Sequence, residues 1–253
     1  MKPFDYPQYL ADFEATAAQR GLVGETVVET AVGPIRIWQT PGEVVDGCRG
    51  FISAGIHGDE PAGPLALLDY LRRHELPTHR SWVIAPALNP TGLVAGTREN
   101  HAGIDLNRDF LQQRSAEAKA LVAWWQRQSA SCVFHLSLHE DWEAQGLYLY
   151  ALNTSSNTCF AQTLAERLGR HIRLQTTGPV DDHLLAAPGL ILHEPEPDEP
   201  QGWPEAIWLV KRAPTVSYTL EAPGAFTPAE RVEALRTGLA LALELDQEAE
   251  SGA

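Results

Sequence analysis

The chain has few cysteines, no long apolar run and no recognisable export signal. Its 253 residues include three cysteines, which is not the even set expected of a disulfide framework and fits a reducing compartment. No stretch is long and apolar enough to span a bilayer, and residues 1–7 lack the apolar core of a signal peptide. These absences predict a cytoplasmic protein with reduced thiols.

Basic residues are also scarce, and this shortage excludes some partners. Lys and Arg number 19 against 33 Asp and Glu, which gives a formal net charge of −14. A surface this acidic repels nucleic acid and anionic membranes and attracts cationic substrates. We therefore expect no nucleic acid and no membrane as partners. The sequence leaves the oligomeric state open.

The composition is that of a globular enzyme, with 44% hydrophobic and 21% charged residues. Apolar patterns predict strands over residues 26–30, 35–40, 50–56, 81–86, 132–139, 147–151 and 215–220, and helices over residues 6–20, 61–76, 115–128, 156–169 and 228–247. Alternating strands and helices indicate a mostly parallel sheet covered on both faces, and the opening hairpin adds antiparallel strands at one edge. We predict a single α/β domain over residues 1–253, with three layers and a mixed central sheet.

The first chemically distinctive segment is His57-Gly58-Asp59-Glu60. It follows the predicted strand 50–56, and its glycines together with Pro61 are typical of a sharp turn into a helix. His57 and Glu60 therefore lie three residues apart on a strand-to-helix turn, where both side chains can converge on one ion. Taken alone, this pattern is equally compatible with an acidic helix start beside a turn histidine.

Two further candidates lie at strand ends. Alternation over residues 132–139 places His135 and His139 on one face, with His139 at the carboxyl end, where α/β sheets build their sites. We expect His135, which lies deeper, to be a hydrogen-bonded core histidine. Glu221 ends another apolar stretch, and a carboxylate at that position needs a partner such as a metal site.

Together with Arg98 and the segment 105–108, these residues form a set that resembles the M14 zinc carboxypeptidase family in its compact bacterial form. The related succinylglutamate desuccinylase and aspartoacylase group shares the same motifs. The resemblance spans residues 51–221 and rests on the motifs at residues 55–60, 89–92, 105–108, 137–139 and 219–221. Two histidines and one glutamate are a known ligand set of hydrolytic zinc.

The resemblance implies a role for each residue of the metal site. One Zn²⁺ per chain would bind to His57, Glu60 and His139, and Glu221 would act as general base and then as general acid. Arg98 would stabilise the oxyanion.

The resemblance also implies roles for the segment 105–108. Asp105 would accept the free ring N–H of His57, while Asn107 and Arg108 would hold the terminal carboxylate of the substrate. Taken alone, Arg98 and Arg108 are also compatible with surface arginines, and Asp105 with a turn cap.

One family feature is missing. Digestive carboxypeptidases carry a mobile tyrosine before the catalytic glutamate, yet residues 181–217 contain no tyrosine. The substrate-capping step and the ordinary carboxypeptidase specificity therefore do not carry over from the resemblance.

The acidic character predicts a preference for a basic C-terminal residue or an ammonium-bearing diamino acid. The acidic loop 194–200 could rim the pocket or simply be a solvated surface loop. Glu205 is the candidate for the pocket floor, although it could instead occupy the first turn of a short helix after Pro204.

Three functions remain open. The first is a zinc metallocarboxypeptidase or peptide amidase, and the second is a zinc deacylase of N-acyl amino acids. The third is a non-catalytic peptide-binding protein on the same scaffold. The single helix that we expect after Glu221, in place of an added β-domain, favours the peptidase over the deacylase. Retention of His57, Glu60, His139 and Glu221 favours catalysis.

Overall fold

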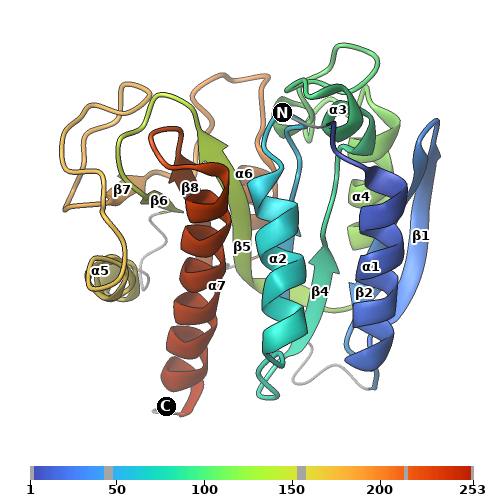
Figure 1. The fold of residues 1–253 in the computed structure, drawn as a ribbon, viewed down its shortest axis with the longest axis horizontal. Coiled ribbons are helices and arrows are strands. Elements are labelled where there is room, and N and C mark those ends of the chain that lie inside the picture. Colours follow the sequence, from blue (N-terminus) through green and yellow to red (C-terminus); the bar gives the residue numbers. More distant parts are fainter. Residues whose placement is uncertain (1–2, 43–47, 153–157, 214–215, 252–253) are drawn as a thin grey trace.

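The computed structural model describes residues 3–42, 48–152, 158–213 and 216–251. Within these ranges the centre of the molecule is one eight-stranded sheet in the order β1-β2-β4-β3-β5-β8-β6-β7 (Figure 1). Its strands are β1 Val23–Thr30, β2 Gly33–Gln39, β3 Cys48–Ala54, β4 Ser81–Ala85, β5 Ser131–Asp141, β6 Tyr148–Leu152, β7 Leu190–His193 and β8 Val216–Pro223.

The sheet is mixed and mostly parallel, as predicted. β3 pairs in parallel with β4 and β5, β5 with β8, and β6 with β7. The opening hairpin of β1 and β2 adds antiparallel strands at one edge, because β2 pairs antiparallel with β4. A second reversal, between β6 and β8, was not predicted.

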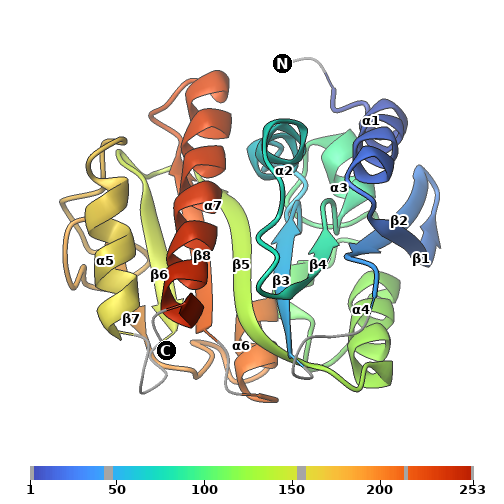
Figure 2. The ribbon, with the colours of Figure 1, turned by 90° about the horizontal axis from the view of Figure 1, so that it is seen from below.

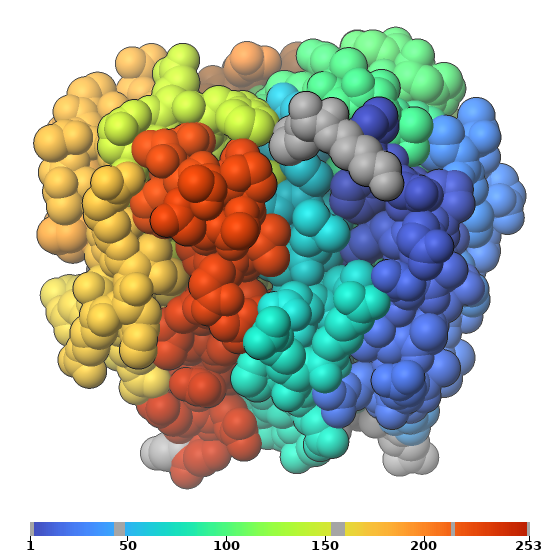
Figure 3. All heavy atoms as spheres, in the orientation of Figure 1, coloured from blue at the N-terminus to red at the C-terminus, as the bar shows by residue number. Residues whose placement is uncertain are grey.

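Helices cover both faces of the sheet. They are α1 Tyr6–Gln19, α2 Ala62–Arg73, α3 Pro90–Ala95, α4 Ala116–Arg127, α5 Thr158–Leu168, α6 Glu205–Val210 and α7 Pro228–Ser251, with a 3₁₀ turn at Leu106–Arg108. Helices α1, α2, α5 and α7 lie on one face, and α4 and α6 lie on the other (Figure 2). Figure 3 shows α7, α2 and α1 side by side across the first face. The predicted three-layer arrangement is confirmed.

Each face of the sheet has its own apolar core. The alternation in β5 sends Phe134, Leu136 and Leu138 into the core beneath α2 and α7. The core beneath α4 contains Phe51 and Trp124. Side chains on the face of β5 opposite to Phe134 therefore point away from the larger core, and near the carboxyl end of the strand they reach the site.

Helix α7 packs unusually close to the sheet. A Cβ at Gly238 would lie 2.7 Å from Cδ1 of Leu220 in β8, so the side chain of Leu220 would have to shift to admit a larger residue. Buried residues of α7 recur with the period of a helix, which gives one continuous apolar stripe. The helix therefore holds β8, and with it Glu221, firmly in the sheet.

The structure adds elements that the sequence patterns did not predict. Helix α3 lies inside the segment 88–113, which reads as loop, and β7 and α6 lie between residues 181 and 217. The elements that were predicted begin and end within a few residues of their expected bounds.

The thiol of Cys132 is buried and donates to the carbonyl of Phe134, 3.3 Å away. The side chains of Cys48 and Cys159 lie outside the described part of the chain. Among the described residues, no helix combines the length and the apolar character that crossing a bilayer requires.

Candidate active site

Glycines shape the turn that carries His57 and Glu60. Gly55 has a φ of +63°, a left-handed conformation that glycine adopts without strain. Gly58 lies so close to Gly92 that a Cβ at residue 58 would be only 2.0 Å from the carbonyl carbon of Gly92. This turn therefore depends on glycine at both places, and its geometry is fixed by the neighbouring loop.

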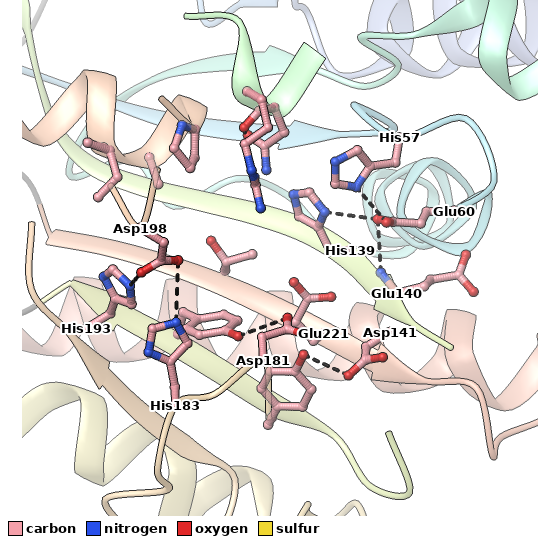
Figure 4. A pocket seen from close by; sticks show the side chains of 18 of the residues that line it. His57, Glu60, His139, Glu140, Asp141, Asp181, His183, His193, Asp198 and Glu221 are labelled. Atoms are coloured by element: carbon pink, nitrogen blue, oxygen red, sulfur yellow. Dashed lines mark hydrogen bonds and ion pairs between the residues drawn. The ribbon is translucent and has the colours of Figure 1, made fainter. Parts of the chain in front are cut away.

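Three side chains converge at this turn, as Figure 4 shows. Nδ1 of His57 lies 2.6 Å from Oε1 of Glu60, and Nδ1 of His139 lies 2.9 Å from Oε2. The ligand atoms of all three residues lie within 4.8 Å of one another. The structure thus brings together the three residues that the sequence singled out as metal ligands.

These residues fit a zinc ion. Two imidazole nitrogens and one carboxylate oxygen supply three ligands and leave a fourth position open, which is the arrangement of catalytic zinc. Burial disfavours the charged ring of His57, yet the carboxylates of Glu60 and Asp105 outweigh it and raise the pKa of His57 to about 9. The pKa of Glu60 is far below its usual range despite burial, because both histidines face it. A cation between these groups would replace the proton that the site otherwise holds.

Arg98 and Asp105 lie beside His57. Nε of Arg98 donates to Oδ2 of Asp105 at 2.9 Å, and Oδ1 of Asp105 lies 3.4 Å from Nε2 of His57. The backbone of Arg98 is held because its carbonyl accepts from Gly58 N at 3.3 Å and from Asn89 Nδ2 at 3.1 Å. The side chain is 40% exposed and lines the pocket. Its Nη1 lies 3.4 Å from Nδ1 of His57 and 3.8 Å from Oε1 of Glu60, so the guanidinium faces the metal-ligand candidates.

Glu221 lies opposite His139 in the register of the parallel strands β5 and β8. Its side chain lines the same pocket as the three ligand candidates. Removal from bulk water, together with the negative charges of Glu60, Asp141 and Asp181, raises the pKa of Glu221 well above its usual range. A carboxylate with a raised pKa is suited to accepting a proton from water and passing it on.

Asn107 and Arg108 come from the 3₁₀ turn and also line the pocket. Oδ1 of Asn107 accepts from the backbone N–H of Glu205 at 3.0 Å. Because that oxygen is occupied, the amide nitrogen of Asn107 is the group left to meet a ligand, and it can only donate. The turn therefore offers two hydrogen-bond donors from adjacent residues, which suits a carboxylate.

A buried ion pair that the sequence analysis missed lies behind the metal ligands. Oε2 of Glu140 lies 2.5 Å from Nη1 of Arg231 on α7, and Oε1 accepts from Ala62 N at 2.6 Å. The backbone N–H of Glu140 donates to Oε2 of Glu60 at 3.1 Å. Burial raises the pKa of Glu140 to about 7, although Ala62 and Arg231 oppose that shift. Through these contacts Glu140 connects Arg231 of α7 with Glu60 and with the start of α2.

Comparison with known proteins places this geometry in a family. Residues 46–176, more than half of the chain, match the model of the succinylglutamate desuccinylase/aspartoacylase catalytic domain. This chain belongs to that family. The matched segment contains His57, Glu60 and His139, whereas Glu221 lies beyond it.

Curated relatives of this desuccinylase/aspartoacylase family member match over parts of the chain. Murein peptide amidase A of Escherichia coli strain K12 is 36% identical over 75 residues, which are 30% of this chain and 31% of that protein. The match therefore spans less than a third of the length of that relative.

Solved structures extend the likeness to nearly the whole chain. A Shewanella denitrificans structure described as a metallopeptidase is 27% identical with a TM-score of 0.82, and the match covers 94% of this chain and 89% of that one. A metallo-carboxypeptidase from Burkholderia cenocepacia is 18% identical with a TM-score of 0.75, and the match covers 99% and 70%. The latter shows the fold alone. The expected relationship to zinc carboxypeptidases is confirmed.

Glu205 begins α6 directly after Pro204, which was one of its two predicted placements, and the other placement, on the pocket floor, is wrong. It is not among the residues that line the pocket, and only 2% of it is exposed. Its Oε2 accepts from Ser53 Oγ and lies 3.1 Å from Nε2 of His135, whose Nδ1 lies 2.9 Å from Ser217 Oγ. These groups offset part of the cost of burying the carboxylate, whereas its Oε1 is buried without a hydrogen-bond partner. Glu205 therefore belongs beneath the pocket floor, and His135 is the hydrogen-bonded core histidine that was expected.

The pocket has a volume of about 520 Å³. Apart from the acidic loop 194–200, its second wall comes from side chains to which the sequence analysis gave no role, among them Asp141, Tyr148, Tyr150 and Asp181. Tyr148 donates to Oδ2 of Asp141 at 2.9 Å, and Tyr150 donates to Oδ2 of Asp181 at 3.3 Å. Both tyrosines lie on one face of β6, so they occupy the pocket although residues 181–217 contain none. Of the acidic loop, Pro197 and Asp198 line the pocket.

Proposed function

We propose that this chain is a zinc-dependent hydrolase that cleaves a peptide or amide bond next to a free carboxylate, as a metallocarboxypeptidase or peptide amidase does. The observation that carries the proposal is one pocket lined by His57, Glu60, His139, Glu221 and Arg108. The family, and the likeness to a murein peptide amidase, support hydrolysis of an amide.

The 3₁₀ turn would position the substrate. The guanidinium of Arg108 and the amide nitrogen of Asn107 would bind the terminal carboxylate, which places the last amide bond near the metal ligands. The contact of Asn107 with the Glu205 backbone holds that amide in its donor orientation.

The chemical step would use two side chains besides the ligands. Zinc, when bound, polarises the carbonyl and lowers the pKa of water. The guanidinium of Arg98 would donate to the oxygen on which negative charge develops, an interaction worth about 3 kcal/mol for a well-placed donor. Glu221 would take the proton of the attacking water and deliver it to the leaving nitrogen.

The second wall would select the substrate by charge. Its carboxylates come from Asp141, Glu143, Asp181 and Asp198, so a cationic side chain is favoured over an anionic one. Asp181 is the strongest candidate because it lines the pocket and its Oδ2 accepts from Tyr150 in the same wall. Because Glu205 is buried, the preference for a basic residue now rests on these acids.

A second candidate function is deacylation of N-acyl amino acids. The family model itself supports it, because it describes desuccinylase and aspartoacylase catalytic domains. Such substrates also end in a free carboxylate, so Arg108 and Asn107 would serve both functions. Acidic acyl groups would, however, meet a wall rich in carboxylates.

A substrate panel with and without chelator distinguishes the two functions. One arm holds peptides that end in Arg, Phe or Glu and a peptide with a terminal diamino acid, and the other holds N-acetyl and N-succinyl amino acids. We expect chelator-sensitive cleavage in the peptide arm. Cleavage confined to the second arm would establish the deacylase, and absence of any chelator-sensitive turnover would overturn the proposal. A cytoplasmic location and one zinc per chain stay predictions from the sequence.

A further inference from the structure

A second group of two histidines and one carboxylate lies on the wall of the pocket, apart from the first (Figure 4). His193 is the last residue of β7, His183 lies in the preceding segment, and Asp198 lies in the acidic loop. Their ligand atoms all lie within 4.8 Å of one another. The fold thus assembles this group from three separate parts of the chain.

The arrangement repeats that of the first site. Nε2 of His193 lies 3.1 Å from Oδ1 of Asp198, and Nε2 of His183 lies 3.5 Å from Oδ2. One carboxylate therefore faces two imidazoles, one through each oxygen, as Glu60 faces His57 and His139. A positive charge between the three groups would satisfy all of them at once.

The hydrogen bond on the far side of His193 decides its tautomer. Nδ1 of His193 lies 2.6 Å from the backbone carbonyl oxygen of Glu194. A carbonyl oxygen only accepts, so Nδ1 carries the hydrogen, and in the neutral ring Nε2 is a bare lone pair that faces the carboxylate. Two electron-rich atoms in that position repel each other unless a proton or a metal ion lies between them. Metal-bound histidines commonly donate their other ring N–H to a backbone carbonyl in this manner.

The two rings are held in place by contacts that do not involve Asp198. Their centroids are 4.6 Å apart, and the ring of Tyr150 packs against both at 5.7 Å and 6.1 Å. His183 is also bonded to Val180 through both backbone groups, at 2.8 Å and 3.0 Å. The ring nitrogens are thus organised before any ion binds, which lowers the ordering cost of binding.

We propose that His183, His193 and Asp198 form a second site for a divalent transition metal such as Zn²⁺. Three protein ligands would leave coordination positions for water or for a group of the substrate. The side chain of Asp198 is 63% exposed, and those of the histidines are 25% and 13% exposed. The site is therefore more open than the first one, and it binds zinc more weakly.

Zinc titration of the purified, zinc-loaded protein tests the proposal through stoichiometry. Equilibrium dialysis with metal analysis should show one tightly held equivalent and a second, weaker one. The double variant His183→Gln/His193→Gln should lose only the weaker equivalent, and His171→Gln, which removes an imidazole outside the pocket, should keep both. A wild-type protein that takes up one equivalent, or a double variant that still takes up two, overturns the proposal.

Two further variants keep the result interpretable. Asp198→Asn alters an exposed side chain that folding does not require, and it should weaken the second equivalent at least about tenfold. His139→Ala should lose the tight equivalent and keep the weak one, which separates this site from the proposed catalytic one. If Asp198→Asn binds both equivalents as the wild type does, the carboxylate is no ligand and the proposal fails.

Discussion

His139 and Glu221 are directly paired across the parallel strands β5 and β8. A proposed metal ligand and the proposed base thus lie on neighbouring strands at the same level of the sheet. A slip of one residue between these strands would turn one of the two side chains to the opposite face, because side chains alternate along a strand. The register of a single strand pair therefore sets the relation between the metal and the proton acceptor.

The first prediction concerns the zinc ligands. His139→Ala should lose nearly all zinc that survives dialysis, because two protein ligands hold the ion far less tightly than three. Metal analysis of the dialysed protein measures this loss, with His171→Ala as the control. Full retention of zinc in His139→Ala would remove this site from consideration.

The second prediction concerns the base. Glu221→Gln keeps the size of the side chain but cannot accept a proton, so turnover should fall by at least about 100-fold. Zinc content and thermal stability should stay unchanged. Glu166→Gln, which alters an exposed carboxylate on α5, should keep full activity. Activity of Glu221→Gln within tenfold of wild type would place the base elsewhere.

The third prediction concerns the pH dependence of zinc binding. In the metal-free protein the pKa of His57 is raised to about 9, so at pH 7 its ring carries a proton that must leave before zinc binds. Apparent affinity should therefore rise with pH up to about 9, by about tenfold per pH unit for this one group. Chelator competition from pH 6 to pH 9 measures the slope. Affinity independent of pH in this range would contradict the protonated His57.

The same shift affects the stability of the metal-free protein. Because the pKa of His57 is higher in the folded state, its contribution to the free energy of unfolding is present in full below pH 6.5. It is lost as pH rises towards 9. Urea unfolding of the zinc-free protein should show this loss, and His57→Gln should show less of it.

The fourth prediction concerns the buried pair of Glu140 and Arg231. With a pKa of about 7, Glu140 is mostly neutral at pH 6 and ionised at pH 9, where it needs its partner. Arg231→Met should therefore cost little at pH 6 and about 3 kcal/mol of unfolding free energy at pH 9. Arg73→Met, which alters an exposed pair on α2, should leave the unfolding free energy nearly unchanged at both values. Equal losses for Arg231→Met at both pH values would contradict this account.

The fifth prediction concerns specificity. Wild-type enzyme should cleave a peptide ending in Arg more efficiently than one ending in Phe or Glu. Asp181→Asn should reduce that preference about tenfold, since asparagine tolerates the positive φ but carries no charge.

Asp182→Asn is the matched control, because Asp182 also has a positive φ, of 64°, yet does not line the pocket. Glu205→Gln should change stability rather than preference, because its carboxylate is buried. If the wild type cleaves the peptide ending in Phe as efficiently as the one ending in Arg, this explanation of specificity is wrong.

The hydrolytic side of the pocket could be predicted from the sequence because its signals are local. His57 and Glu60 are three residues apart on one turn, and the period of two in β5 places His139 at a strand end. The order of strands and helices in between likewise follows from apolar periodicity. Such features need no knowledge of how distant segments pack.

Only the acidic loop 194–200 of the second wall was a candidate from the sequence, because the rest of that wall depends on distant packing. His183 and Asp198 lie in segments without periodicity, and the four-residue β7 exists because it pairs with β6. Glu205 illustrates a local signal that is right and a distant one that is not. Its place in the first turn of a helix after Pro204 could be predicted, whereas its burial beside Ser53 and His135 depends on the tertiary fold.

The turn that carries His57 and the loop that carries Arg98 are held together. Gly58 packs against Gly92, and the N–H of Gly58 donates to the carbonyl of Arg98. A side chain at Gly58 would collide with the backbone of Gly92 and would therefore displace the turn of His57 relative to the loop that carries Arg98. Neither of these two contacts involves residues 181–198 of the second wall, which form loops on either side of the short strand β7. Replacing residues 181–198 should therefore change the substrate preference and leave the relative positions of His57 and Arg98 unchanged.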